Sequence, residues 1–316
     1  MAMPDVTWQG QVAGVNEAFD TFKAEQAFPI RILEKILPAM IRKSSKLFHN
    51  IRTAISAYTG LDDFQNAVHS GKVNDLSAFT HKLRLTKSPA EIKLMRDSAS
   101  IACQGLLQTM LHSRAFPHEG QLSAKIEYEC RIRGAERMAF NPVVASGQNA
   151  SVIHYSRNDQ KEELYTLILE TNKECLKLCK PGASISEIHN HSVELLREGF
   201  KSIGILRGVG NKRYHQLNPT NIGHYLGMDV HDCSAVGYDC PLKPGVVITI
   251  EPGVYIPSLW DCPKWYRGIG IRIEDEVLIT ETGCEVLTAS SPKEIGQMES
   301  LLNNHRHGRE GAASRS

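Results

Sequence analysis

Residues Gly223–Asp232 read Gly-His-Tyr-Leu-Gly-Met-Asp-Val-His-Asp, and this stretch, with two that follow it, decides the fold. The second is Ile-Thr-Ile-Glu-Pro-Gly-Val-Tyr at Ile248–Tyr255, and the third is Gly-Ile-Gly-Ile-Arg-Ile-Glu-Asp at Gly268–Asp275. By spacing alone His224 and His231 are a weak signal, because a His-Glu-x-x-His pattern is absent and a buried His usually makes an ordinary hydrogen bond.

The second and third stretches are predicted strands in which side chains alternate between two faces. In the first of these strands Thr249 and Glu251 share a face, and in the other Arg272 and Glu274 do. A carboxylate held among apolar residues beside an Arg is either half of a salt bridge or a metal ligand with a nearby cation. Each strand taken by itself favours the salt bridge, and the three stretches taken together favour the metal ligand.

Composition excludes several classes of protein. The 316 residues are 41% hydrophobic and 22% charged, as in a soluble globular chain, and the net charge is +1. Without a block of Lys and Arg, nucleic acid and anionic membranes are not expected as partners, and small peptides fit better. No apolar run approaches the roughly 20 residues of a membrane span, so no membrane insertion is expected. The start, Met1–Trp8, resembles neither a secretory signal nor a mitochondrial presequence.

Eight cysteines are spread singly, and only Cys175 and Cys179 lie close together, one turn apart on a predicted helix. We interpret them as reduced thiols, mostly in the core. A zinc site would need two further paired ligands, and no neighbouring Cys-x-x-Cys supplies them.

The strongest helix start is Ser88-Pro89-Ala90-Glu91, which combines a capping Ser, a Pro at the first helical position and a Glu three residues after the cap. A domain boundary is therefore predicted just before it. Residues 1–86 would be the remnant of an N-terminal domain, 87–302 the main domain, and the polar segment 303–316 a disordered tail.

Within the main domain the patterns alternate between helices and strands. The predicted elements are helices from Ser88, from about Gly120 to Arg133, from Glu162 to Pro181, and from a second capping box at Ser184, with strands around Val143, 151–155, 246–254 and 270–280. This order of helix, helix, strands, helix, helix, strands predicts a doubled α+β arrangement.

From Leu85 to Leu302 the chain resembles the aminopeptidase P family, on the three stretches quoted above. These motifs are most similar to those of the intermediate cleaving peptidases of plant mitochondria, which are relatives of aminopeptidase P. The resemblance implies the pita-bread fold, a pseudo-twofold antiparallel sheet with flanking helices, here preceded by part of a creatinase-like N-terminal domain.

The resemblance also implies roles for individual residues. It makes His224, Glu251 and Glu274 metal ligands, with one Glu placed to shuttle the proton of the attacking water. It makes His231 a contact to the substrate near the scissile bond, His154 in Val-Ile-His-Tyr a residue of the pocket, and Arg272 an orienting group. Oxygen-rich ligation with one imidazole suits Mn(II), although Zn(II) or Co(II) could occupy such a site in vitro.

The family site holds two ions and uses two further Asp ligands from a strand pair before the third helix. Here only Ser156–Lys161 stands in that place, and Asp159 cannot replace both. The resemblance therefore implies a form that lacks part of one half-sheet and binds one ion or none. A further departure is Thr220, four residues before His224, where many relatives have another His.

The function that follows is a metal-dependent aminopeptidase, which removes an N-terminal residue from peptides or imported proteins. The alternative is a catalytically impaired relative that binds peptides through the same cleft, and a third possibility is a creatinase-like hydrolase. Peptide or protein N-termini are the expected partners, together with a possible homodimer. A mitochondrial location is implied by resemblance, with the cytoplasm as the alternative.

Overall fold

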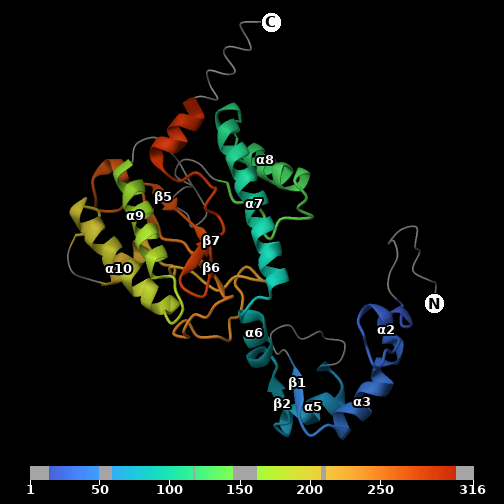
Figure 1. Cartoon of the computed structure of the whole chain (residues 1–316). Helices are drawn as coiled ribbons and strands as arrows, with labels where there is room; N and C mark the ends of the chain where they lie inside the picture. Colours follow the sequence, from blue (N-terminus) through green and yellow to red (C-terminus); the bar gives the residue numbers. More distant parts are fainter. Residues whose placement is uncertain (1–13, 50–58, 117, 145–161, 208–210, 304–316) are drawn as a thin grey trace, which may run out of the picture. The chain divides into compact units, whose positions relative to one another are not determined.

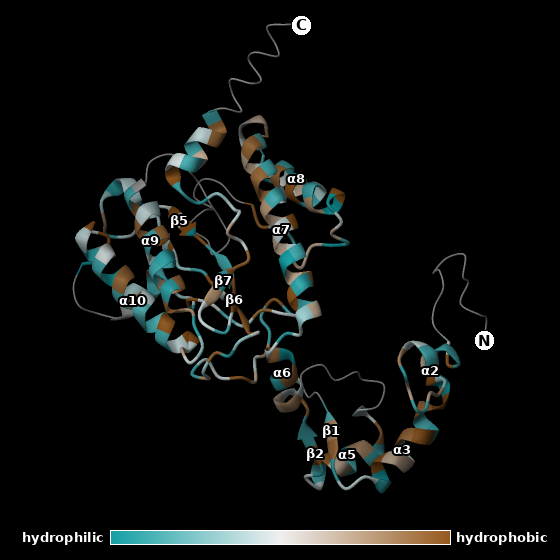
Figure 2. Ribbon diagram, viewed as in Figure 1, coloured by the Kyte–Doolittle hydropathy of each residue, from teal (hydrophilic) through white to brown (hydrophobic). Residues whose placement is uncertain are grey.

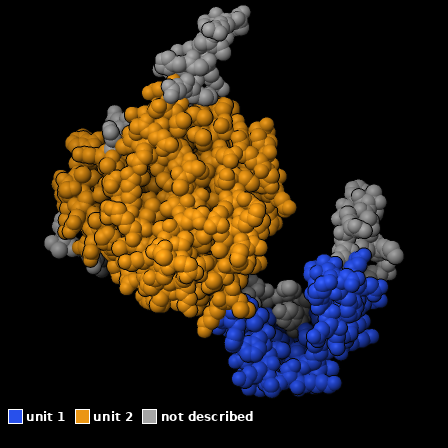
Figure 3. All heavy atoms as spheres, viewed as in Figure 1, with its two compact units in different colours: residues 1–80 blue, residues 81–316 orange. Residues whose placement is uncertain are grey.

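The computed structural model describes residues 14–49, 59–116, 118–144, 162–207 and 211–303 (Figure 1). These residues form two compact units, which divide between Thr80 and His81 (Figure 3). The division falls inside helix α6 (Ser77–Leu85), slightly before the predicted boundary at residue 86. The predicted tail lies outside the described residues from 304 onward.

The first unit is small and mixed. Its elements are the helices α2 (Glu17–Thr21), α3 (Leu33–Lys43) and α5 (Asp62–His69) and the parallel strands β1 (Leu47–His49) and β2 (Val73–Asp75). Its core is formed by Ile41, Phe64 and Ala67, which are buried. Ile41 belongs to the amphipathic pattern of α3, so the apolar face of that helix packs against α5.

The second unit carries most of the helices. They are α7 (Pro89–His112), α8 (Glu119–Ile132), α9 (Glu162–Leu178), α10 (Ile185–Ser202), α11 (Asn211–Leu217) and a last helix at 295–303. Both predicted capping boxes are confirmed, since the Ser88 and Ser184 hydroxyls accept from the backbone N–H groups of Glu91 and Glu187. None of the described helices combines the length and apolar content needed to cross a bilayer.

The described strands of the second unit form three antiparallel pairs, and two of these pairs follow one another as ladders along the same two segments of the chain. The strands are β3 (Val247–Ile250), β4 (Gly253–Ile256), β5 (Ile269–Arg272), β6 (Asp275–Ile279) and β7 (Cys284–Val286). β3 pairs with β6 and ends at the partners Ile250 and Asp275, and β4 pairs with β5 from the partners Gly253 and Arg272. Residues 251–252, between β3 and β4, therefore lie opposite residues 273–274, between β5 and β6.

Helices α9 and α10 pack on each other, and α9 contacts both β3 and β5. In Figure 2 both helices alternate between hydrophobic and hydrophilic residues, as helices with one face on a core do. One core cluster joins Leu164 and Ile168 of α9 to Val254 of β4, and another joins Cys175 of α9 to Ile248 of β3. Apolar side chains of α9 therefore pack against both ladders and hold their strands in place.

One strand prediction was wrong. Residues 141–144, which include Val143, have no regular structure. Pro142 removes a backbone donor there, and no described strand lies in pairing contact with these residues. The neighbouring predicted strand at 151–155 lies outside the described residues.

Candidate metal centre

The structure brings together the three residues for which the resemblance implies metal ligation. One ligand atom each from His224, Glu251 and Glu274 can be chosen so that all three lie within 4.8 Å of one another. Continuing the register of both ladders places Glu251 directly opposite Glu274, since Ile250 pairs with Asp275. Cross-strand neighbours are about 5 Å apart between Cα atoms, so the convergence follows from strand pairing.

The backbone at Gly223 is what brings His224 to this point. A Cβ atom added to Gly223 would lie 1.8 Å from the carbonyl oxygen of Thr249, so only Gly permits this approach to β3. The His224 N–H donates to the Thr249 hydroxyl at 3.0 Å, and the Thr249 N–H donates back to the His224 carbonyl at 3.0 Å. The loop is therefore fixed against the strand that leads to Glu251.

A backbone carbonyl sets the orientation of the His224 ring. Nδ1 lies 3.0 Å from the Tyr225 carbonyl oxygen, which can only accept, so Nδ1 carries the hydrogen. The other ring nitrogen, Nε2, faces Glu251 Oε1 at 3.3 Å. If Nε2 were unprotonated, two lone pairs would face each other in a site where both side chains are about 11% exposed. A proton or a metal cation between them relieves that repulsion.

The three groups shift one another's pKa values. Burial alone would lower the pKa of His224, but the hydrogen bonds with Glu251 and the Tyr225 carbonyl, together with the charges of Glu251 and Glu274, outweigh burial, and the pKa is raised. Burial alone would raise the pKa of Glu251, but His224 and the charge of Arg272 outweigh it, and the pKa is lowered. Desolvation, followed by repulsion from Glu251, raises the pKa of Glu274 to about 7.

Arg272 lies behind Glu251, where it forms a short ion pair with Oε2 of that carboxylate. The same guanidinium donates from Nε to the Tyr255 hydroxyl at 2.7 Å and from Nη2 to Thr220 Oγ1 at 3.1 Å. These contacts fix the guanidinium on the Oε2 side of Glu251, whereas Oε1 faces His224 and accepts from the Thr249 hydroxyl at 3.1 Å.

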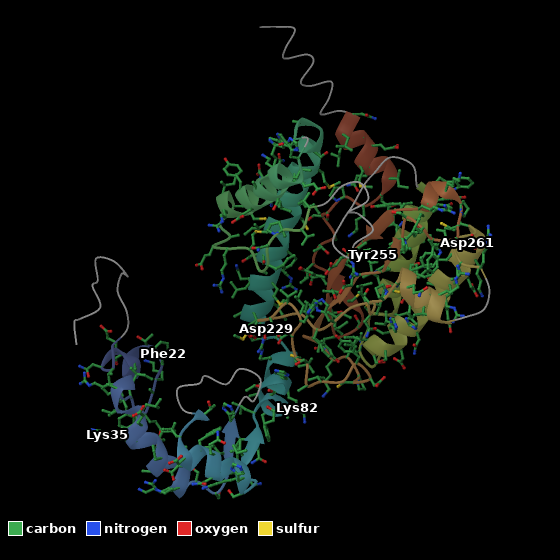
Figure 4. All side chains as sticks on the ribbon, turned by 180° about the vertical axis from the view of Figure 1, so that it is seen from behind. Phe22, Lys35, Lys82, Asp229, Tyr255 and Asp261 are labelled. Carbon is green, nitrogen blue, oxygen red and sulfur yellow. The ribbon has the colours of Figure 1, made fainter. Side chains whose placement is uncertain are left out.

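His231 lies beside the cluster, with its ring centroid 4.4 Å from that of His224 in an edge-to-face arrangement. Its own side chain is exposed, and its loop is anchored by Arg84. The guanidinium of Arg84 lies 2.6 Å from both Asp229 Oδ2 and Asp232 Oδ1, one on either side of His231. Figure 4 labels Asp229 and Tyr255, which come from the loop and from β4.

Two residues of this site, Tyr255 and Arg84, were not predicted from the sequence. Tyr255 could have been found, because strand alternation puts it on the same face as Glu251. Arg84 could not, because it lies 145 residues before Asp229 and no motif connects them. His154 lies outside the described residues, and so does Asp159.

Comparison with known proteins places this geometry in a family. Residues 93–162 and 156–281 match the model of metallopeptidase family M24. The chain is 61% identical to intermediate cleaving peptidase 55, mitochondrial, of Arabidopsis thaliana, over 96% of this chain and 68% of that protein. It is 32% identical to human Xaa-Pro aminopeptidase 3 over 94% of this chain and 68% of that protein. The solved structure of Escherichia coli aminopeptidase P matches with a TM-score of 0.84 at 27% identity, covering 95% and 80% of the two chains.

Two features of these matches point to residues that the relatives have and this chain lacks. The family model matches in two pieces that meet at residues 156–162. The Arabidopsis alignment runs over 339 positions, whereas 96% of this chain is about 303 residues, so about 36 positions hold residues of the relative only. The family model matches more than half of this chain, and the chain is more than 30% identical to known peptidases. A solved structure with the pita-bread fold also matches its architecture. The chain therefore belongs to metallopeptidase family M24.

Proposed function

We propose that this protein is a metal-dependent aminopeptidase in which His224, Glu251 and Glu274 hold a single divalent ion. The membership of family M24 carries the reaction class. The observation that carries the site is the imidazole of His224, whose Nδ1 is used by a carbonyl and whose Nε2 faces a carboxylate at 3.3 Å. That arrangement is the usual one for a metal-binding His, in which a backbone oxygen fixes the ring and leaves the second nitrogen free.

The donor set fits a divalent cation of intermediate hardness. Two carboxylates and one imidazole supply two negative charges in a partly buried site, and Mn(II) accepts such oxygen-rich ligation. We infer Mn(II) as the resident ion on this ground. The short Arg272–Glu251 ion pair uses the carboxylate oxygen turned away from His224, so it is compatible with a metal on the other oxygen.

A divalent ion in this position supplies Lewis acidity toward a peptide carbonyl and toward water. Of the two Glu ligands, Glu274 is the more exposed, so it is proposed to be the one that passes on the proton of the attacking water. His231 is exposed next to the cluster and donates to the substrate near the scissile bond. Arg272 orients Glu251 through the ion pair and carries out no proton transfer.

One ion, and not two, follows from the charge of the site. Two divalent ions carry four positive charges, and Glu251 with Glu274 offers two negative ones, so the repulsion between two ions would be poorly compensated. The two pieces of the family match meet at residues 156–162, where the resemblance puts the two Asp ligands that this chain lacks. Their absence supports binding of a single ion. We therefore expect slower turnover than in a two-metal relative, by several orders of magnitude.

The substrate is proposed to be the N-terminus of a peptide or an imported protein. The named relatives support this, because they are an intermediate cleaving peptidase and Xaa-Pro aminopeptidases. A mitochondrial location is proposed on the same ground, since the Arabidopsis relative is named mitochondrial. Formation of a homodimer stays a prediction.

The test is release of the first residue from an X-Pro peptide, followed by mass spectrometry over hours with and without Mn(II). We expect slow release that requires Mn(II) and falls at least about a hundredfold in Glu274→Gln, which removes a charged ligand and proton acceptor. Glu281→Gln, at an exposed turn outside the cluster, is the matched control and should behave as wild type. Peptide binding without any metal-dependent release would contradict the proposal and favour an impaired peptide-binding relative.

A further inference from the structure

Two cysteines far apart in the sequence meet at the C-terminal end of α9. Cys179 follows the last residue of that helix, and Cys284 is the first residue of β7. The Cys179 thiol donates to the Cys175 carbonyl at 3.4 Å, and the Cys284 thiol donates to the Leu176 carbonyl at 3.6 Å. Those carbonyls belong to consecutive residues of one helical turn, and Cys284 packs against the core cluster that contains Cys179.

The two thiols differ in accessibility and acidity. Cys179 is 2% exposed within the core cluster that contains Cys175, whereas Cys284 is only partly buried at the edge of that cluster. The nearby Cys179 thiol lowers the pKa of Cys284 to about 7, against the opposing effect of burial. The same interaction between the two thiols, together with burial, raises the pKa of Cys179. Cys284 is therefore the thiol that loses its proton first and that a small reagent can reach.

We propose that Cys284 and Cys179 form a peroxide-sensitive pair that closes into a disulfide. The Cys284 thiolate attacks one oxygen of hydrogen peroxide, the O–O bond breaks, and the products are a sulfenic acid on Cys284 and hydroxide. The Cys179 sulfur then attacks the Cys284 sulfur and displaces hydroxide, which takes up the proton of Cys179. The two thiols are oxidised by two electrons, and the peroxide is reduced to two molecules of water.

The remaining six cysteines lack this combination of exposure and a partner thiol. Cys240 is also partly exposed, but its thiol donates to the Pro241 carbonyl at 3.9 Å. Cys175 is fully buried, and its thiol faces the Ile188 carbonyl at 4.0 Å. A partly exposed thiol with a resolving thiol in contact is the environment in which reversible oxidation occurs.

A disulfide here would enclose the candidate metal centre. The closed loop runs from Cys179 to Cys284 and contains His224, Glu251 and Glu274. It would connect the end of α9, which packs on β3, to β7, which pairs with the strand that follows Glu274. Because a crosslink over a long loop restricts the unfolded chain, the oxidised protein should unfold at a higher temperature than the reduced one.

The experiment exposes the purified full chain to hydrogen peroxide at pH 7.5, blocks free thiols with iodoacetamide and maps the peptides by mass spectrometry. We expect one crosslinked peptide pair that contains Cys179 and Cys284 and lacks two hydrogens, while Cys240 stays alkylated. Dithiothreitol should restore both thiols. The Cys240→Ser variant, as a matched control, should form the same crosslink, and Cys284→Ser should form none.

A second measurement keeps the test independent of how well a variant of buried Cys179 folds. In the native wild-type chain without peroxide, iodoacetamide should modify Cys284 at least about tenfold faster than Cys240 at pH 7.5, because the lowered pKa of Cys284, about 7, leaves a large share of that thiol as thiolate. Equal or slower modification of Cys284 would overturn the proposal. So would peroxide treatment that oxidises Cys284 to sulfinic acid, or crosslinks Cys284 to another cysteine, while Cys179 stays free.

Discussion

Replacing Arg272 by Met removes the cation that compensates Glu251 while keeping a side chain of similar length. The side chains of Glu251 and Arg272 are 11% and 21% exposed, so their ion pair is largely shielded from water. The substitution leaves a buried carboxylate beside His224 and deprives the Tyr255 hydroxyl of its donor at 2.7 Å. Removing one partner of such a pair costs about 3–5 kcal/mol, and the partial exposure of Arg272 favours the lower end of that range.

A loss of about 3 kcal/mol corresponds to a fall of about 6–12 °C in the melting temperature of a domain of 150–250 residues. The assay is thermal unfolding of the metal-free protein, followed by circular dichroism. Arg96→Met is the matched control, because Arg96 forms a bidentate pair with Glu285 in which both side chains are exposed, 47% and 40%. Such surface pairs contribute little, so this variant should melt like wild type.

Adding Mn(II) should narrow the difference. In the Arg272→Met variant a bound ion replaces the positive charge of Arg272 beside Glu251. Saturating Mn(II) should therefore raise the melting temperature of the variant by more than it raises that of wild type. If Arg272→Met melts together with Arg96→Met, or if Mn(II) raises the melting temperature of wild type more than that of the variant, Arg272 does not compensate the charge of Glu251.

Two further predictions concern the same centre. Affinity for Mn(II) should fall by at least about tenfold between pH 8 and pH 6, because Glu274, with a pKa of about 7, and His224, with its raised pKa, must both lose protons to bind metal; equal calorimetric affinities at the two pH values would contradict this. Gly223→Ala should lower the free energy of unfolding by more than about 4 kcal/mol in urea, because its Cβ would lie 1.8 Å from the Thr249 carbonyl. Gly237→Ala, with nothing within 4 Å, should have little effect, and equal stability of the two variants would refute the close-approach argument.

The elements that were predictable from sequence are those whose signals are local. The capping boxes at Ser88 and Ser184 predicted two helix starts, because the cap and the reciprocating Glu are three residues apart. Strand alternation likewise put Arg272 and Glu274 on one face. The family resemblance then added what spacing could not, namely that His224 joins these two strands in one site.

Contacts between distant segments were not predictable in this way. The clamp of Arg84 on Asp232 and the meeting of Cys179 with Cys284 depend on how whole elements pack, and neither leaves a pattern in either segment. The strand expected around Val143 failed for a related reason. A short apolar stretch becomes a strand only when a partner strand satisfies its backbone groups, and tertiary pairing is not written in local composition.

The most direct test of the single-ion centre is the metal content of the purified chain. The protein is saturated with Mn(II), dialysed extensively and analysed by inductively coupled plasma mass spectrometry against protein concentration. We expect one Mn(II) per chain in wild type and in Glu281→Gln, and none retained in a variant that combines His224→Ala with Glu274→Gln. Two ions per wild-type chain, or one ion still retained by the double variant, would contradict the assignment of the site to His224, Glu251 and Glu274.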